Sequence, residues 1–351
     1  MEYNNMGNNN RLSFSSDYME GAHPRILERL IETNMEKTTA YGLDVYSESA
    51  RRKIREACGA PDADIYFLAG GTQVNATMID AFLRPYQGVI SAESGHITAH
   101  EAGAIEFGGH KILMLPQHNG KLVAEDVENC IKQYRDDENH DHMIMPGMVY
   151  ISQPTEQGTL YSLNELKALS NVCRAGGIPL YLDGARLAYA LACPENDVTL
   201  PDIAKYCDAF YIGGTKCGTL FGEAVVVPEH DRIPHLFTII KQHGALLAKG
   251  RITGLQFDTL FTDDLYGSIG RNAIEIAQKI RRALTEKGYE FAFHSPTNQI
   301  FIKLDKNKAD ALSRNIEMGF WENVDDSHVV MRIATSWATK AEDVDRLITC
   351  L

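Results

Sequence analysis

The fold is decided by two short segments, YLDGAR at Tyr181–Arg186 and YIGGTK at Tyr211–Lys216. Each begins as an apolar, strand-like run and leads to an ionisable residue, the acid Asp183 in the first and the amine Lys216 in the second. A strand that ends just before a lysine places the amine at the carboxyl edge of a sheet, where open α/β folds bind their ligands. We therefore expect an α/β protein with Asp183 and Lys216 in its binding site.

Short β-rich runs alternate with helical patterns from about residue 64 to residue 228, which indicates strand–helix units in a mainly parallel sheet. Predicted helices include Val74–Leu83 and Leu163–Ala175, and the spacing of Ser162 and Glu165 predicts a capping box before the second. The predicted fold class is α/β, with a mixed, mainly parallel seven-stranded sheet flanked by helices. Its strands are predicted at Ile65–Leu68, Val89–Ala92, Lys111–Leu115, Met148–Ser152, Leu180–Asp183, Ala209–Ile212 and Ala224–Val227.

The pattern changes near residue 258. A long amphipathic helix is predicted over Leu265–Lys287, and it ends at Gly288. The elements predicted after it are the strands Glu290–Phe293 and Gln299–Leu304, a helix, the strand Val329–Ala334 and a final helix from Ala341. We predict three parts: an N-terminal arm and segment at 1–50, a large α/β domain that contains the binding site at 51–257, and a small C-terminal α+β domain at 258–351.

Composition and charge exclude several classes of protein. The net charge of −13 argues against nucleic acid or an anionic membrane as the main partner, and no apolar run approaches the roughly 18 residues of a membrane span. Met1–Arg11 has no apolar core of a secretory signal, so we expect a frayed arm there. The seven cysteines include no Cys-x-x-Cys pair, which fits a reducing cytoplasm without disulfides or a zinc site. The run Asp136–His142 is typical of a solvated loop, so no metal site is expected.

The turn after the first predicted strand has the sequence AGGTQ at residues 69–73 and leads into a helix. Glycines let backbone amides approach an anion, and a helix N-terminus favours negative charge. The turn matches neither the Gly-x-Gly-x-x-Gly nor the Walker A pattern, which weighs against dinucleotides and nucleoside triphosphates. Pyridoxal phosphate needs a lysine for its Schiff base and an acid that keeps its ring nitrogen protonated. A phosphate turn together with Asp183 and Lys216 therefore predicts pyridoxal 5'-phosphate as the cofactor.

Two further residues are candidates for this site. His96 lies just past the strand Val89–Ala92, where an imidazole can stack on a pyridine ring and move protons; an ordinary loop histidine is the alternative. Arg332 lies inside the apolar strand Val329–Ala334, where an unpaired guanidinium would be costly. Its expected partner is a substrate carboxylate, and a structural salt bridge is an equal alternative.

In their order, these motifs resemble the threonine aldolase family of pyridoxal-phosphate enzymes, which has the aspartate aminotransferase-type fold. The resemblance covers nearly the whole chain. The matching segments are Ser15–Tyr18, Gly21–Pro24, Tyr41–Tyr46, Gly71–Gln73, His96 with Glu101–Gly103, Ser152–Glu156, Asp183–Arg186, Gly213–Lys216 and Met331–Ile333.

The resemblance implies a role for each matching residue. Lys216 would hold the cofactor covalently, Asp183 would pair with its ring nitrogen, and His96 would stack on its ring. The residues expected at the cofactor are Gly71, Thr72 and Gln73 at the phosphate, together with His96, Asp183, Arg186, Thr215 and Lys216. The residues expected to bind the substrate are Ser16, Tyr46, Arg186 and Arg332.

The family also implies an assembly. Its members are dimers or tetramers with sites at a subunit interface, so we expect a homodimer or homotetramer in which residues 1–50 contribute to the site and the interface. Tyr46 and the basic segment Lys249–Arg251 are expected to serve the neighbouring site.

The chain departs from the family pattern at Glu156, where many members carry a histidine that touches the substrate β-hydroxyl. A carboxylate there is a candidate base, with His96 or a bound water as the alternative. The implied activity is retro-aldol cleavage of threonine, allo-threonine or a related β-hydroxy-α-amino acid to glycine and an aldehyde. The alternatives are a β-eliminating lyase or aminotransferase, which would use Lys216 and Asp183 alike, and a non-catalytic cofactor-binding protein, which needs no carboxylate clamp.

Overall fold

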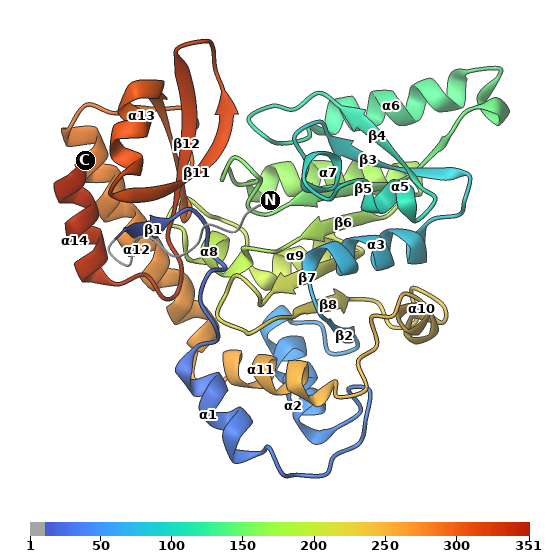
Figure 1. The fold of residues 1–351 in the computed structure, drawn as a ribbon. Coiled ribbons are helices and arrows are strands. Elements are labelled where there is room, and N and C mark those ends of the chain that lie inside the picture. Colours follow the sequence, from blue (N-terminus) through green and yellow to red (C-terminus); the bar gives the residue numbers. More distant parts are fainter. Residues whose placement is uncertain (1–10) are drawn as a thin grey trace.

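The computed structural model describes residues 11–351. Figure 1 shows a large sheet with helices on both faces and, beside it, a smaller sheet formed mainly by the C-terminal part of the chain. The predicted arm at Met1–Arg11 lies, except for Arg11, outside the described residues. No helix in the described part is long and apolar enough to cross a bilayer.

The large sheet has seven strands in the order β2-β8-β7-β6-β5-β3-β4. Strand β8 is antiparallel to both of its neighbours, and the other neighbouring pairs are parallel. The predicted mixed, mainly parallel sheet is therefore confirmed, and each predicted strand is present. The bounds are β2 (Asp64–Leu68), β3 (Gln87–Ala92), β4 (Lys111–Leu115), β5 (Met145–Ser152), β6 (Leu180–Asp183), β7 (Ala209–Gly213) and β8 (Glu223–Val227).

Helices cover the two faces of this sheet because its strands are apolar on both sides. One buried cluster joins the sheet to α3 (Gly71–Phe82), α4 (His96–Ala99), α5 (Ala104–Phe107) and α10 (Leu236–Gln242). The other joins it to α1 (Pro24–Glu32), α2 (Val45–Cys58), α6 (Ala124–Asp136), α7 (Leu163–Gly176), α8 (Leu187–Ala192), α9 (Leu200–Tyr206), α11 (Arg251–Leu260) and α12 (Leu265–Glu286). A short 3₁₀ helix spans His140–His142.

The predicted capping box is present at the start of α7. The Ser162 side chain accepts a hydrogen bond from the Glu165 amide, and the Glu165 carboxylate accepts one from the Ser162 amide. These two amides at the helix start are therefore satisfied by neighbouring side chains.

The small sheet has five strands in the order β1-β11-β12-β10-β9, and α12, α13 (Lys306–Ser313) and α14 (Ala341–Cys350) pack on it. Its strands are β1 (Leu12–Phe14), β9 (Glu290–Phe291), β10 (Gln299–Asp305), β11 (Ile316–Asn323) and β12 (His328–Ala334). Strands β1 and β11 were not predicted from the sequence; they pair with each other in parallel.

The N-terminal residues join both parts of the molecule. Strand β1 belongs to the small sheet, whereas α1 and α2 pack against α11 below the large sheet in Figure 1. The predicted boundaries at residues 50/51 and 257/258 fall inside α2 and α11. The division into three parts stays a prediction.

Candidate active site

A cavity of about 590 Å³ lies at the carboxyl edge of the large sheet and is closed on its other side by residues of the small sheet. Four of its lining residues come from the small sheet: Gln299, Phe320, Trp321 and Arg332. The predicted site residues that line it are Gly71, Thr72, His96, Glu156, Arg186, Thr215, Lys216 and Arg332. Four predicted residues are not among its lining residues: Asp183, Gln73, Ser16 and Tyr46.

Asp183 ends β6 and is only 3% exposed. Its Oδ2 accepts hydrogen bonds from the Tyr150 hydroxyl (2.7 Å) and the Asn75 amide (3.0 Å), and its Oδ1 accepts from the Tyr211 hydroxyl (2.5 Å). Burial alone would raise the pKa of Asp183, but the positive charge of His96 and these hydrogen bonds outweigh it and lower the pKa. The site therefore holds a charged carboxylate at the end of β6.

Asn75 extends this network to a second acid and was missed by sequence analysis. Its amide nitrogen also donates to Glu101 Oε1 at 2.9 Å, and its amide oxygen accepts from the Tyr181 hydroxyl at 3.0 Å. The other oxygen of Glu101 is buried and forms no hydrogen bond within residues 11–351, and burial raises the pKa of Glu101. An asparagine inside a helix gives no signal of such a role.

Lys216 follows the turn after β7. A Cβ on Gly213 would overlap the carbonyl oxygen of Ala185, so the turn needs glycine there because the two backbones approach closely. The Lys216 amine lies 5.8 Å from the centroid of the Tyr18 ring. Among residues 11–351, Lys216 forms no ion pair, so its amine is available for covalent chemistry.

The predicted phosphate turn forms the start of α3. Gly70 is the N-cap residue and supplies no side-chain hydrogen bond, so the first amides of the helix have no cap. Gln73 turns its side-chain oxygen back to the Ala69 amide at 3.2 Å, and Gly71 lines the cavity next to the Tyr211 hydroxyl. The donors at this end of the cavity are therefore backbone amides and the Thr72 side chain, a set that suits a phosphate.

His96 is the first residue of α4, and its Nδ1 lies 3.4 Å from Glu156 Oε1. Burial alone would lower the pKa of His96, but the hydrogen bond to Glu156 and the negative charge of that carboxylate raise it. Glu156 also accepts a hydrogen bond from Ser152 at 3.3 Å and is 8% exposed. His96 and Glu156 therefore form an ion pair when the imidazole is protonated.

Arg332 on β12 donates to Gln299 Oε1 (3.1 Å) and to the backbone oxygen of Ser15 (2.8 Å). Within residues 11–351 it makes no ion pair, so the alternative of a structural salt bridge is not observed. Three buried polar atoms in this region form no hydrogen bond with any residue that the structure describes: Arg332 Nε, Gln299 Nε2 and Ser16 Oγ. All three can donate a hydrogen bond, which suits a carboxylate.

Arg186 differs from Arg332 because its guanidinium is already engaged. Its Nε and one terminal nitrogen donate to the two oxygens of Asp17, at 2.6 Å and 3.0 Å. Asp17 is fully buried; burial alone would raise its pKa, but the Arg186 charge and hydrogen bond lower it to about 2. Sequence analysis missed Asp17, although the residue lies within a segment that resembles the family.

Tyr46 is not among the residues that line the cavity. Its hydroxyl donates to Glu36 at 2.5 Å, and the Arg29 guanidinium lies 5.7 Å from its ring. The expectation that Tyr46 contributes to the site of a neighbouring subunit stays a prediction.

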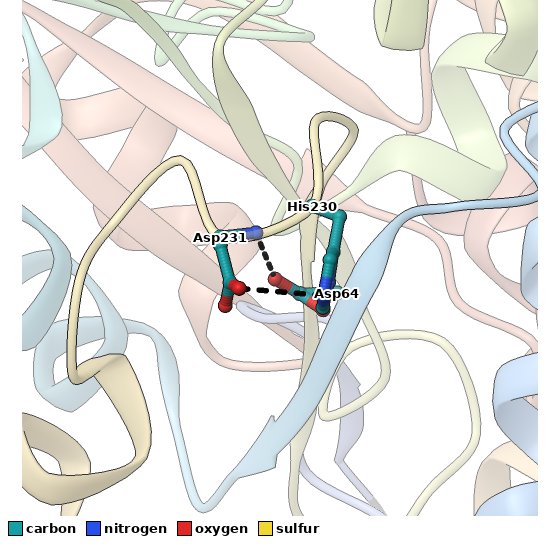
Figure 2. Close-up of side chains that lie close together, drawn as sticks. All are labelled: Asp64, His230 and Asp231. Atoms are coloured by element: carbon teal, nitrogen blue, oxygen red, sulfur yellow. Dashed lines mark hydrogen bonds and ion pairs between the residues drawn. The ribbon is translucent and has the colours of Figure 1, made fainter.

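Outside the cavity, Asp64, His230 and Asp231 form a cluster of possible metal ligands, which Figure 2 shows. His230 Nδ1 lies 2.8 Å from Asp64 Oδ1, and the Asp231 amide donates to Asp64 Oδ2 at 2.9 Å. The polar atoms of this cluster thus bond to one another. Asp64 begins β2, at the end of that strand opposite the cavity.

Comparison with known proteins agrees with this geometry. The chain is similar over its fold to aspartate aminotransferase from Thermus thermophilus (TM-score 0.70, 14% identity, 97% of this chain and 91% of that chain), a fold-type I enzyme. It is more similar to the threonine aldolase structure from Leishmania major, with 41% identity, a TM-score of 0.93 and coverage of 96% of this chain and 98% of that chain. A low specificity L-threonine aldolase from Pseudomonas aeruginosa is 28% identical over 340 residues, 95% of each protein.

The class is therefore that of the fold-type I enzymes, whose aminotransferase and aldolase members use pyridoxal phosphate. The family model described as beta-eliminating lyase matches residues 13–311, and the chain belongs to this family of lyases. The resemblance to threonine aldolases noted from the sequence is confirmed.

Proposed function

We propose that the chain is a pyridoxal-phosphate-dependent aldolase that cleaves threonine, allo-threonine or a related β-hydroxy-α-amino acid to glycine and an aldehyde. The similarity to the threonine aldolases of Leishmania major and Pseudomonas aeruginosa supports this substrate class. The single observation that carries the proposal is that one cavity brings together the start of α3, Arg332 and Lys216, which forms no ion pair among residues 11–351. The buried, charged Asp183 is hydrogen-bonded to Tyr211, which lines the same cavity.

The residues fit the cofactor by the chemistry of their donors. Gly71 and Thr72 would hold the phosphate with the backbone amide of Gln73, Lys216 would form the covalent link, and Asp183 would face the ring nitrogen. Bound pyridoxal phosphate supplies an imine link to the amino acid and an electron sink for the bond that breaks. Thr215 and Arg186 complete this wall of the cavity.

The substrate carboxylate is assigned to Arg332, with Ser16 and Gln299 as additional donors. Each of the three residues has a buried donor atom without a protein partner, and an unpaired buried donor costs about 1–3 kcal/mol. A bound carboxylate would satisfy these donors at once. Arg186 is assigned a positioning role, because Asp17 already holds its guanidinium.

Glu156 is assigned as the base that accepts the β-hydroxyl proton when the Cα–Cβ bond breaks. The pKa of His96 is raised, so its imidazole is protonated over more of the neutral range and is then unable to accept a proton. The partner carboxylate at 3.4 Å keeps its acceptor oxygens and faces the same cavity. His96 would stack on the cofactor ring and stabilise the charge of Glu156.

The experiment is a product assay on the purified protein with a panel of amino acids. Aldol cleavage yields glycine and an aldehyde, β-elimination yields ammonia and a keto acid, and transamination yields a keto acid and an aminated cofactor. Glycine released from threonine or allo-threonine in step with acetaldehyde supports the proposal. Ammonia or keto acid as the main product, or no turnover of any amino acid by the cofactor-loaded protein, would refute it.

We also infer that the active form is a homodimer or homotetramer in a reducing cytoplasm, with Tyr46 and Lys249–Arg251 near the neighbouring site. Large apolar side chains of the N-terminal segment are exposed in the single chain, among them Ile31 (76%) and Met35 (89%), which supports a covering partner. All seven cysteines are free, which suits a reducing compartment.

A further inference from the structure

A second acid faces the cavity beside Lys216 and has no role in the chemistry described above. Glu223 is the first residue of β8, lines the cavity and is 3% exposed. In the sheet it lies opposite Leu68 of β2 on one side and Gly213 of β7 on the other. These are the last residues of their strands, before the phosphate turn and the lysine turn respectively. Glu223 is therefore held between the two segments that would bind the cofactor.

Within the described part of the chain, the Glu223 carboxyl is bound by hydrogen-bond donors and forms no ion pair. Its Oε2 accepts a hydrogen bond from the Gly214 amide at 2.8 Å, and the Thr215 hydroxyl lies within reach. Among residues 11–351, no lysine, arginine or histidine forms an ion pair with it. A phosphate brings up to two negative charges into the same cavity, and a neighbouring charge of like sign favours the protonated acid.

The surroundings leave Glu223 close to its titration point. The pKa of Glu223 is raised to about 7. Burial is the largest cause and the Asp183 charge adds to it, whereas the hydrogen bonds from Thr215 and Gly214 and the Lys216 charge lower the pKa. The other titratable groups that face it are neutral at this pH because burial raises their pKa values: Tyr181 on β6, Tyr211 on β7, Cys217 and Tyr266 on α12. Lys216 and Asp183 are thus the charged groups around it.

We propose that Glu223 is a proton-uptake group for the cofactor: its carboxyl, held at the cavity between the phosphate turn and the lysine turn, takes up a proton when a phosphate ester binds there. The inference rests on the proposed function, since it requires pyridoxal phosphate in this cavity. One proton then moves from solvent to a Glu223 carboxylate oxygen for each cofactor bound. The neutral acid no longer repels the phosphate and still accepts from Gly214.

The consequence is a pH-dependent affinity. Where the free acid is ionised and the bound acid is protonated, the association constant falls by up to about tenfold per pH unit as the pH rises. Below about pH 7 Glu223 is protonated in both states and adds no pH dependence. Glu223→Gln removes the titration but keeps a carbonyl oxygen for the Gly214 amide, so its affinity should decline less steeply above neutral pH.

The test is calorimetric titration of cofactor-free protein with pyridoxamine 5'-phosphate, which carries the ring and phosphate but no aldehyde to react with Lys216. Measurements between about pH 6 and pH 9, in two buffers of different protonation enthalpy, count the protons taken up. We expect wild type to take up close to one more proton than Glu223→Gln near pH 8. Glu101→Gln is the matched control, because Glu101 is a buried acid whose pKa is also raised by burial and which does not line the cavity. This variant should keep the wild-type slope.

Equal slopes in wild type and Glu223→Gln would overturn the inference while leaving the proposed function intact, and so would an equal loss of slope in Glu101→Gln. Absence of binding in all three proteins would overturn both proposals. If Glu223→Gln does not fold, the proton count of wild type, corrected for titration of the free ligand, decides the question: no net uptake by the protein refutes it.

Discussion

Replacing the two arginines of the site should have different effects: loss of activity for Arg332 and loss of stability for Arg186. Arg332 makes hydrogen bonds to Gln299 and Ser15 but no ion pair among the described residues, whereas Arg186 holds the buried Asp17 through two short contacts. Arg332→Lys would lose a bidentate, charge-assisted contact to the substrate carboxylate, worth about 2–5 kcal/mol. This corresponds to a fall in kcat/KM of about 30-fold to 5,000-fold. Arg186→Met would leave Asp17 as an uncompensated buried charge, at a cost of about 3–5 kcal/mol in stability.

The assay is steady-state cleavage of threonine, with cofactor content and thermal unfolding measured on the same samples. Arg332→Lys should keep its cofactor and its melting temperature while it loses kcat/KM, and Arg186→Met should melt well below wild type. An Arg332→Lys enzyme with unchanged kinetics would remove Arg332 from the substrate site. An Arg186→Met protein as stable as wild type would show that the Asp17 pair does not support the fold.

Four further predictions use the same preparations. Borohydride reduction of the yellow holoenzyme should fix the cofactor on Lys216, and peptide mapping to another lysine would contradict this. Asp183→Asn should lower turnover by about 10²–10³-fold, while the donors around it lose an acceptor and stability falls by about 1–3 kcal/mol; full turnover per folded molecule would make Asp183 structural. Glu156→Gln should slow threonine cleavage strongly, Glu156→His should retain much of the activity, and both variants should keep the transamination side reactions. If Glu156→Gln cleaves threonine as fast as wild type, His96 or a bound water is the base. The pKa of Asp17 falls from 3.8 to about 2 on folding, so about 2 kcal/mol of stability present above pH 3.8 should be lost as the pH falls toward 2, and Asp17→Asn should lack this acid step in urea unfolding.

The large sheet could be predicted from the sequence because its strands are short apolar runs between turn residues, buried on both faces. Strand β11 could not be predicted, since its sequence IEMGFWEN mixes charged and apolar residues, three of its eight residues are exposed and its pairing is irregular between Phe320 and Glu322. Strand β1 has three residues, too few to show a period. Both were therefore invisible to pattern analysis, although β11 supplies Phe320 and Trp321 to the cavity.

Residues at strand ends were predictable because the carboxyl edge of a parallel sheet gathers them at one place. The hydrogen-bond network around Asp183 could not be predicted, because the sequence around Asn75 does not show whether its side chain is buried or solvated. One signal was present: Tyr150, Tyr181 and Tyr211 each stand two residues before the last residue of their strands, so their side chains share a face of the sheet. An acid at the start of the apolar strand EAVVV was the corresponding signal for Glu223.

The acids of the site show why burial alone does not decide their charge. Asp183, Glu101 and Glu223 are all buried, and burial raises the pKa of each. The pKa of Asp183 is lowered, because the positive charge of His96 is nearby and both carboxylate oxygens accept hydrogen bonds. The pKa values of Glu101 and Glu223 are raised. Among the described residues, Glu101 has one oxygen without a hydrogen bond and Glu223 has no ion pair. The number of donors and nearby cations therefore decides which acid is charged. Of these three acids, Asp183 is the one whose surroundings favour the charged form, as its proposed pairing with the ring nitrogen of the cofactor requires. An ionised Glu223 would repel a phosphate or a carboxylate bound in the same cavity, whereas the protonated acid would not.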